Sequence, residues 1–537
     1  MDPVRGRSRK VTLVQFGQGS IGAAMSARYL SGILRSHGYG VTIVSVEPTK
    51  KKGSGQSWDY GYYDLSDSSI KDIFEISRGS LFVGITVYSF VAHLVKKIYA
   101  SEHNPEKIPI VVGGAHPTLD PYKACLFADY VCVGDGDNAI VGLADLLCQG
   151  TACGESLQPV AENVFSSAAL RRSEDRPVLL GKPAPLDAQS ALDYSFDSEY
   201  RVFEKGFERV TPQNAARHVN IYATFFSRGC VNDCSYCGHD MLAQRSGFQR
   251  RIKAKDVSRF VAEIKAIESD HPWASRVVFF DPNILSNNRA ALKAVLDEYR
   301  RNVKLPLSVT GFTFNQINEE TYREFLTAGM DSVIFGIESG SEKIRRLYNR
   351  RENKSQIVKA DALNQRLKKE FLFNIQYDVI TDCPWEDLND ALESLIFISQ
   401  LKGYDHLDIF SLRFLPGTRL FQKALEDGFL KLEEVDEENQ RVFHSLNRTY
   451  ENFLLLLMRD GFVRRGWLHR ISVSNRVVCA MRWFFARHGD VVFRVYSSKP
   501  ALVFVLFRKR TDRILTLLGR LGLKTTLKIV LNKLRTS

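Results

Sequence analysis

The sequence predicts an α/β protein in which two domains of parallel strands are followed by a mostly helical, basic C-terminal region. Short apolar runs alternate with helical patterns in the first 160 residues, and the same alternation returns after residue 216. Such alternation is typical of parallel sheets covered by helices. We expect a first domain at 1–160, a linker at 161–215, a second domain at 216–428 and the C-terminal region at 429–537.

The first domain is predicted from five apolar runs, with a helix over about 20–36 between the first two. Strands and helices in this order form a doubly wound parallel sheet, whose ligand lies beyond the carboxyl ends of the strands. The predicted strands are 11–16, 41–46, 81–87, 108–112 and 130–133.

The first turn of this domain carries glycines at the spacing of a dinucleotide fingerprint. They are Gly17, Gly19 and Gly22, and Glu47 ends the second run, where an acid would bind a ribose. Glycines at such a turn also serve packing alone. An NAD(P)-linked oxidoreductase therefore remains an alternative, although it leaves the cysteines described below unexplained.

Two later loops carry a different likeness. Gly113-Gly114-Ala-His116 follows the fourth run, and Gly134-Asp-Gly-Asp137 follows the fifth. These loops resemble those of the Rossmann-like cobalamin-binding domains that precede many radical S-adenosylmethionine (SAM) barrels. The resemblance covers about 11–147, and the Asp-x-His-x-x-Gly motif that supplies a lower axial histidine is absent from this segment. It implies cobalamin contacts at Thr86, Gly113, Gly114 and His116, although His116 is equally consistent with a turn histidine bonded to backbone.

Residues 148–214 are rich in Gly, Ser, Pro and charged residues and show weak periodicity. This composition predicts a linker on the surface without catalytic residues.

Three cysteines lie close together after a predicted strand at 220–226. Cys230, Cys234 and Cys237 have C-x3-C-x2-C spacing, which lets three thiolates hold one cubane cluster and leaves a fourth iron open. An open iron can chelate SAM and pass one electron to its sulfonium, which releases a 5′-deoxyadenosyl radical. Structural zinc is the rival interpretation, because His239 would complete a Cys3His set. The spacing resembles that of the radical SAM superfamily, and Tyr236 fits the aromatic residue that this family places before its third cysteine as part of the SAM site.

The second domain repeats the alternation of strands and helices. Together with the strand before the cysteines, its apolar runs predict a partial (β/α)6 barrel with an active site at the C-terminal ends of the strands. The further runs are 276–280, 307–310, 332–335, 372–377 and 406–410.

Polar residues follow several of these runs. Glu338 lies in Gly-Ile-Glu-Ser-Gly-Ser, which resembles a family motif whose glutamate contacts SAM. Asp281, Asn283 and Asp378 are weaker candidates, because a carboxylate after a strand is often a helix cap. Cys383 is interpreted as a buried bystander in preference to a substrate contact. No catalytic residue is assigned.

From about 11 to 428 the chain resembles the cobalamin-dependent branch of the radical SAM enzymes. That resemblance implies a [4Fe-4S] cluster, SAM, cobalamin and an electron donor such as flavodoxin or ferredoxin. Its commonest outcome is methylation of an unactivated carbon, here of a small or lipid-like biosynthetic substrate. A cyclase or rearrangement enzyme and a tRNA-modifying radical enzyme remain alternatives.

The net charge of +12 belongs to the end of the chain. Residues 461–537 hold 17 Lys and Arg against Asp490 and Asp512. No RNA-binding motif is visible, and we expect no nucleic-acid partner. The nine cysteines do not suggest a disulfide framework, and no apolar run reaches about 18 residues, which predicts a cytoplasmic protein. The basic amphipathic stretch at 512–534 predicts peripheral contact with the inner face of the membrane or, equally, a helix packed on the barrel.

Overall fold

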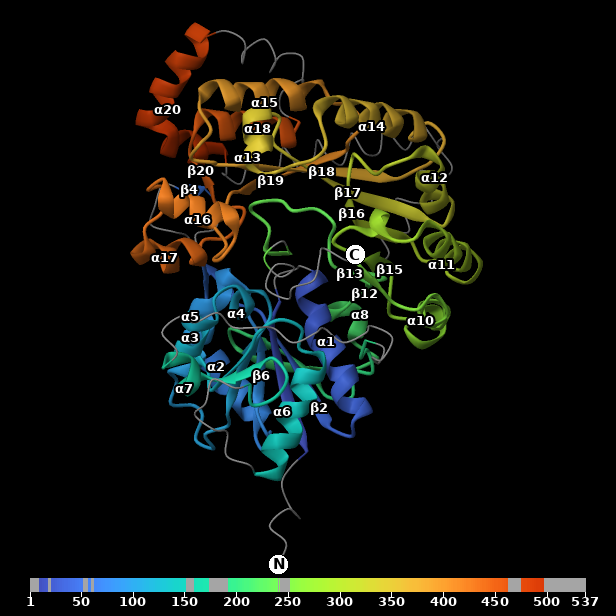
Figure 1. The fold of residues 1–537 in the computed structure, drawn as a ribbon, viewed down its shortest axis with the longest axis vertical. Coiled ribbons are helices and arrows are strands. Elements are labelled where there is room, and N and C mark those ends of the chain that lie inside the picture. Colours follow the sequence, from blue (N-terminus) through green and yellow to red (C-terminus); the bar gives the residue numbers. More distant parts are fainter. Residues whose placement is uncertain are drawn as a thin grey trace, which may run out of the picture.

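The computed structural model describes residues 9–17, 21–51, 57–58, 62–150, 159–172, 192–239, 241, 252–461 and 475–496. Two sheets dominate it. Figure 1 shows the N-terminal sheet in blue and cyan below the second sheet, whose strands run from green to orange. The cysteine loop follows the first strand of the second sheet, β12 (Ile221–Thr224).

The N-terminal sheet confirms the predicted doubly wound domain. Its order is β11-β10-β2-β1-β6-β7-β8-β9, and the five central strands are parallel. The order reverses between β1 and β6, which is where such a sheet opens a crevice for a ligand. The strands are β1 (Lys10–Phe16), β2 (Gly40–Val46), β6 (Val83–Thr86), β7 (Ile110–Gly113) and β8 (Tyr130–Cys132); the main helices are α1 (Ile21–Ser36), α2 (Asp67–Ser77), α3 (Ala92–Tyr99) and α6 (Asp137–Gln149).

The expected surface linker at 161–215 is wrong for much of its length. β9 (Val164–Ser166) pairs with β8, while β10 (Glu199–Phe203) and β11 (Gly206–Val210) extend the other edge beyond β2. β10 reads Glu-Tyr-Arg-Val-Phe, and its two charged residues interrupt the apolar pattern expected of a strand. Glu199 is nevertheless buried, because it forms an ion pair with Arg28 at 2.6 Å. The sequence pattern did not indicate this strand, since the partner of the charge lies far away in the chain.

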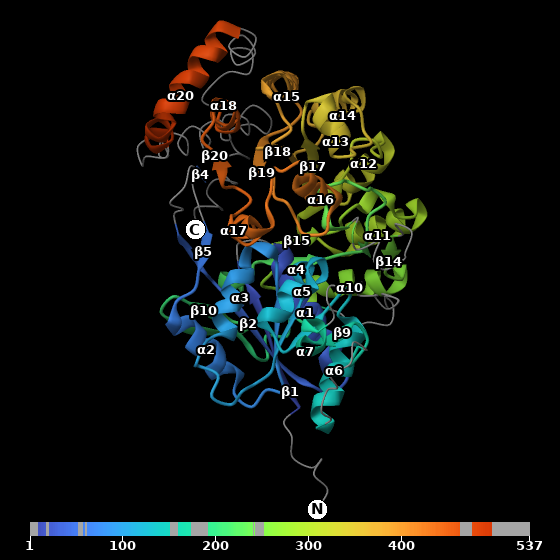
Figure 2. The same cartoon turned by 60° about the vertical axis from the view of Figure 1, so that its left-hand side comes forward.

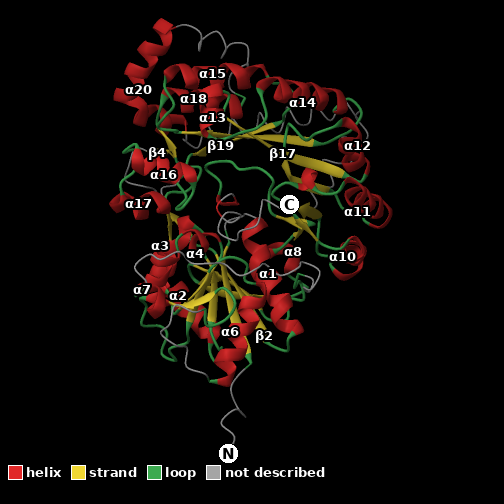
Figure 3. Cartoon of the chain, viewed as in Figure 1, coloured by secondary structure: helices red, strands yellow, loops and turns green. Residues whose placement is uncertain are grey.

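The second sheet is the predicted six-stranded parallel barrel sheet, in the order of the chain. Its helices lie along the outside (Figure 3). The strands are β12 (Ile221–Thr224), β15 (Arg276–Phe279), β16 (Leu307–Phe312), β17 (Met330–Glu338), β18 (Asn374–Thr381) and β19 (His406–Ser411); the helices are α10 (Val257–Asp270), α11 (Arg289–Asn302), α12 (Glu319–Thr327), α13 (Glu342–Leu347), α14 (Lys354–Leu367), α15 (Leu388–Gln400) and α16 (Arg419–Glu426).

The fifth barrel strand lies further along the chain than predicted. The prediction ended it at Tyr377, whereas β18 runs to Thr381. Alternate residues such as Ile375 and Tyr377 are buried in the core beneath the helices, so Asp378 faces the inner side of the sheet. That inward-facing carboxylate interrupted the apolar run.

The described part of the C-terminal region is mostly helical and touches both domains. It contains α17 (Val435–Gln440), α18 (Tyr450–Arg459) and α20 (Asn475–Tyr496), and β20 (Leu446–Asn447) pairs with β4 (Ser57–Trp58). Figure 2 shows α17 against the N-terminal domain, where Asp436 forms ion pairs with Lys96 and Lys123 at 2.8 and 3.0 Å. No helix among the described residues is long and apolar enough to cross a bilayer. The predicted helix at 512–534 lies outside the described residues.

Candidate functional site

Asp281 holds the start of the cysteine loop. It follows β15 and accepts hydrogen bonds from the backbone N–H of Phe226 at 3.0 Å and from the Ser227 hydroxyl at 2.7 Å. Its side chain is buried, and burial raises the pKa of Asp281 to about 6. The structure therefore gives Asp281 a positioning role: it orients the chain just before the cysteines.

The three predicted cluster cysteines lie on one loop. Cys234 is buried and Cys230 and Cys237 are half-buried; the Cys237 N–H donates to the Cys234 carbonyl at 3.1 Å. All three are free thiols, and burial together with the Cys234 and Cys230 thiols raises the pKa of Cys237 to about 12. Each of these neighbouring thiols disfavours ionisation of Cys237, and a bound cation would reverse that effect, which suits an iron–sulfur cluster.

Among the residues described, no group of three Cys, His, Asp or Glu side chains is arranged to coordinate a metal ion. His239 therefore does not complete a preformed Cys3His site in this part of the chain. The fit to a cluster rests on the donor set, three thiols on one loop.

An arginine that the sequence analysis did not single out connects Glu338 with Tyr236 and Cys234 of the cysteine loop. Arg350 lies 3.5 Å from Glu338 Oε1, 3.4 Å from the Tyr236 hydroxyl and 3.7 Å from Cys234 Sγ. It is almost fully buried, whereas the nearby Arg346 is exposed. No sequence signal distinguishes these arginines, because their burial depends on distant elements.

Glu338 ends β17 in a strained conformation. Its φ is +63°, in the left-handed region that non-glycine residues rarely adopt. A Cβ at Gly336 would clash with the Glu338 carboxylate, so the glycine of this motif leaves space for the side chain to fold back over the strand. Burial raises the pKa of Glu338, although Arg350 opposes that rise.

The inner face of the barrel carries further polar groups. Asp378 is opposite Gly336 on one side and Asp408 on the other, and it accepts a hydrogen bond from Gln376 Nε2 at 2.7 Å. Burial, with Glu338 and Asp408 nearby, raises the pKa of Asp378 to about 8, so it is protonated at neutral pH.

Asn283, predicted as a weaker candidate, is fully buried. Neither polar atom of its side-chain amide has a hydrogen-bond partner among the described residues. A buried amide in this state is available to a ligand.

The predicted cobalamin contacts in the N-terminal sheet lie together at its carboxyl edge. Thr86 ends β6, Gly113 ends β7, and Gly114 has φ +102°, with Thr86 Cγ2 at 3.3 Å from the place of a Cβ. The Thr118 hydroxyl donates to the Gly114 carbonyl at 2.7 Å and accepts from the Gly134 N–H at 2.9 Å. Thr118 thus joins the loop at Gly113–Gly114 to the loop at Gly134. We call this surface at the carboxyl end of the sheet, formed by Thr86, Gly113, Gly114 and Gly134, the glycine ledge.

His116 lies behind this ledge. Its ring is buried, stacks on Phe127 and hydrogen-bonds through Nδ1 to the Ser89 hydroxyl at 3.2 Å; burial lowers the pKa of His116 to about 4. This arrangement matches a neutral histidine that shapes the loop. A direct contact with cobalamin stays a prediction.

Glu47 is already engaged in the fold. It forms an ion pair with Arg201 of β10, and its carboxylate occupies the space that a Cβ at Gly17 would need. The acid required by a dinucleotide site is therefore neutralised within the protein, which weakens the oxidoreductase alternative. Gly19 lies outside the described residues.

The two sheets approach each other at the cysteine loop. Leu119, at the end of α4 (Ala115–Leu119), lies 3.5 Å from the place of a Cβ at Gly238, next to Cys237. Arg228, which precedes the loop, pairs with Asp137, the first residue of α6, at 3.1 Å and lies over the Tyr29 ring, 4.1 Å from its centroid. The ledge and the cysteine loop are thus adjacent.

Two family models match the chain in tandem. The B12 binding domain matches residues 18–144 and the Radical SAM superfamily matches residues 224–394. An uncharacterised methyltransferase of Pyrococcus horikoshii is 21% identical over 77% of this chain and 87% of its own length. The bacteriochlorophyllide d C-8(2)-methyltransferase of Chlorobaculum tepidum is 25% identical over 70% of this chain and 76% of its own.

A solved structure shares the arrangement of both domains. The radical SAM methyltransferase TsrM of Kitasatospora setae, with cobalamin and a [4Fe-4S] cluster bound, aligns with a TM-score of 0.58 at 16% identity and covers 78% of each chain. With both family models in tandem on this common fold, the chain belongs to the cobalamin-dependent radical SAM enzymes, whose cofactors are a [4Fe-4S] cluster, SAM and cobalamin.

Proposed function

We propose that this enzyme methylates a carbon of a small or lipid-like biosynthetic substrate, with its cluster on Cys230, Cys234 and Cys237. The observation that carries the proposal is the proximity of the two predicted sites: Leu119, which ends the helix after Gly114, lies 3.5 Å from the place of a Cβ at Gly238, beside Cys237. Two sites this near each other suit one reaction that uses both. The methyltransferases among its relatives, one named for a carbon position of bacteriochlorophyllide d, support the same reaction.

When bound, the cluster with SAM would supply radical chemistry and cobalamin would supply methyl-transfer chemistry, neither of which a side chain can provide. The protein would bind and orient them. Glu338 and Tyr236 would contact SAM beside Arg350, and Thr86, Gly113 and Gly114 would form the surface for cobalamin, with His116 behind them. Asp378, protonated on the inner face of the barrel, would donate a hydrogen bond to substrate.

The test is anaerobic turnover of the reconstituted enzyme with methyl-labelled SAM, a flavodoxin or ferredoxin reducing system, and candidate lipids, tetrapyrroles and natural-product precursors. Mass spectrometry should find a product heavier by one labelled methyl group, together with 5′-deoxyadenosine. A product with the same molecular formula as the substrate would indicate rearrangement, and a product with two hydrogens fewer would indicate ring closure. Either result would refute the proposal of methylation.

We also propose peripheral membrane contact through the basic end of the chain, whose 17 Lys and Arg face only two acidic residues in the sequence. The full chain should co-sediment with anionic vesicles and be released by high salt, because the attraction is electrostatic. A chain that ends at Arg459 should stay in solution. Equal partitioning of both chains would remove this proposal and leave the methylation proposal intact.

A further inference from the structure

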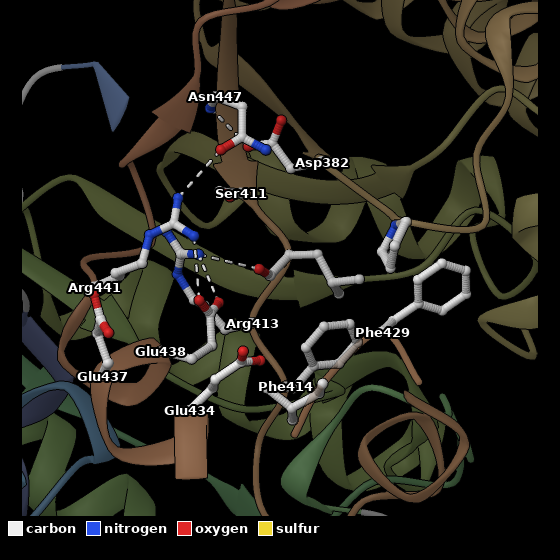
Figure 4. A pocket seen from close by; sticks show the side chains of 13 residues that line it. Asp382, Ser411, Arg413, Phe414, Phe429, Glu434, Glu437, Glu438, Arg441 and Asn447 are labelled. Carbon is white, nitrogen blue, oxygen red and sulfur yellow. Dashed lines mark hydrogen bonds and ion pairs between the residues drawn. The ribbon is translucent and has the colours of Figure 1, made fainter. Parts of the chain in front are cut away.

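A polar pocket of about 370 Å³ opens at the carboxyl ends of the last two barrel strands. Asp382 and Pro384 follow β18, Ser411 ends β19, and α17 with the turn before it forms the opposite wall. Figure 4 shows the carboxylates of α17 and its preceding turn on one side of the pocket and the rings of Phe414 and Phe429 on the other.

The pocket adjoins the predicted SAM site. Leu412 and Phe414 line it, and both belong to the apolar cluster that contains Tyr348 and the partly buried Tyr236. The Tyr236 and Tyr348 rings are in contact, with centroids 5.0 Å apart. A ligand in the pocket would therefore be separated from the cysteine loop by a thin layer of side chains.

The two cations of the pocket pair with one of its carboxylates. Arg413 pairs with Glu438 at 2.9 Å and donates through Nη2 to the carbonyls of Val442 and Ser445, while its buried Nε has no partner among the described residues. Arg441 pairs with the other oxygen of Glu438 at 3.1 Å and donates to Asn447 Oδ1. The charge of both guanidiniums is thus offset mainly by Glu438.

Among the described residues, three carboxylates that line the pocket form no ion pair with an arginine. Glu434 and Glu437 are exposed at the rim, and Asp382 accepts only neutral donors, from Asn447 N–H at 3.0 Å and Asn452 Nδ2 at 2.7 Å. Glu434 pairs with Lys431, whose Nζ lies 3.9 Å from Glu434 Oε1. The surplus charge that faces the cavity is negative.

A second observation points to a ligand independently of this charge. Ser411 is 2% exposed, lines the pocket, and its hydroxyl has no hydrogen-bond partner among the described residues. An orphaned buried hydroxyl is costly unless a ligand or water completes it. The faces of Phe414 and Phe429 add an attraction for cations.

We propose that this pocket binds an organic cation, an ammonium group carried on an apolar or aromatic body, and that it anchors the substrate of the radical reaction. The carboxylates and rings recognise the charge, and the Ser411 hydroxyl accepts or donates one further hydrogen bond. As a substrate anchor the pocket rests on the proposed methyltransferase function, while the binding itself does not.

The test is calorimetric titration of the anaerobically reconstituted enzyme with phenethylamine, 2-phenylethanol and 3-phenylpropionate, which share a ring and differ in charge. The amine should bind about tenfold more tightly than the alcohol, and the carboxylate should not bind. The double variant E434Q/E437Q should lose about tenfold in amine affinity and keep its affinity for the alcohol. Phe429→Ala should weaken both.

The matched control is Glu433→Gln, which removes the same charge from the same turn outside the pocket lining. It should leave amine affinity unchanged. Equal affinities for amine and alcohol, no amine binding, or an equal loss in E433Q would overturn the proposal. If the amine binds but no amine substrate is methylated, only the anchoring role is refuted. If a substrate is methylated and phenethylamine does not compete with its binding, the substrate binds outside this pocket, and the anchoring role is likewise refuted.

Discussion

The Arg350 guanidinium lies 3.7 Å from Cys234 Sγ and 3.5 Å from Glu338 Oε1, so one buried cation touches both the cysteine loop and the predicted SAM site. A donor with positive charge beside a thiolate ligand stabilises the reduced, more negative cluster. We expect Arg350→Gln to lower the midpoint potential of the cluster and Arg350→Lys to restore part of it, as followed by EPR during a redox titration.

Arg350 also pairs with the buried Glu352, which would keep only Arg345 at 3.7 Å, so its removal should cost stability, by up to about 3–5 kcal/mol. Arg346→Gln is the control, because this exposed arginine lies four residues away. An unchanged potential in a folded, fully loaded R350Q protein would refute the electrostatic role.

Cluster binding should depend on three of the cysteines and be independent of the others. Anaerobic, reconstituted wild type should contain about four iron atoms per chain, and Ala at Cys230, Cys234 or Cys237 should abolish 5′-deoxyadenosine formation. Cys479→Ala should behave as wild type, since Cys479 is exposed. One bound zinc and no iron in wild type would contradict the assignment.

Cobalamin retention should be sensitive to Gly114. An alanine there would meet Thr86 Cγ2 and the Val87 carbonyl at 3.3 Å in a conformation open almost only to glycine, so the ledge must move. Gly79 also has a positive φ, +70°, but nothing lies within 4 Å of its Cβ position. Equilibrium dialysis against hydroxocobalamin should show weaker retention for Gly114→Ala than for Gly79→Ala. Equal retention would argue against cobalamin at this ledge.

Asp378 should make stability fall with rising pH. Its pKa is about 8 in the fold and near 4 when unfolded, so between these values the folded chain holds a proton that the unfolded chain releases. Its contribution is complete below pH 4 and is lost toward pH 8, by up to about 1.4 kcal/mol per pH unit. Glu386, also raised to about 8, adds the same sign.

Asp378→Asn should therefore flatten the decline between pH 6 and pH 8 in calorimetric unfolding of the cofactor-free chain, and D378N/E386Q should flatten it further. Asp297→Asn, on the surface of α11, serves as the control. A slope equal to that of wild type in D378N would show that Asp378 is ionised in the fold.

The sequence by itself determined what depends on short spacing. The cysteine triplet, the glycine loops and the apolar runs of both sheets are local patterns, and each is recognisable within about ten residues. They were enough to predict both parallel sheets, all five central strands of the first and all six of the second, and the family to which they belong.

The tertiary structure decided which polar residues are buried and which partners they bind. Arg350 reaches Cys234 across 116 residues, Glu199 of β10 is buried by Arg28 across 171, and Glu47 is neutralised by Arg201 across 154. A charge looks the same in the sequence whether it faces water or a buried partner, because its free energy depends on the dielectric and the opposite charge that the fold brings to it. For that reason Arg350 was missed, the strand at 199–203 was taken for linker, and Asp281 emerged as a support of the cysteine loop.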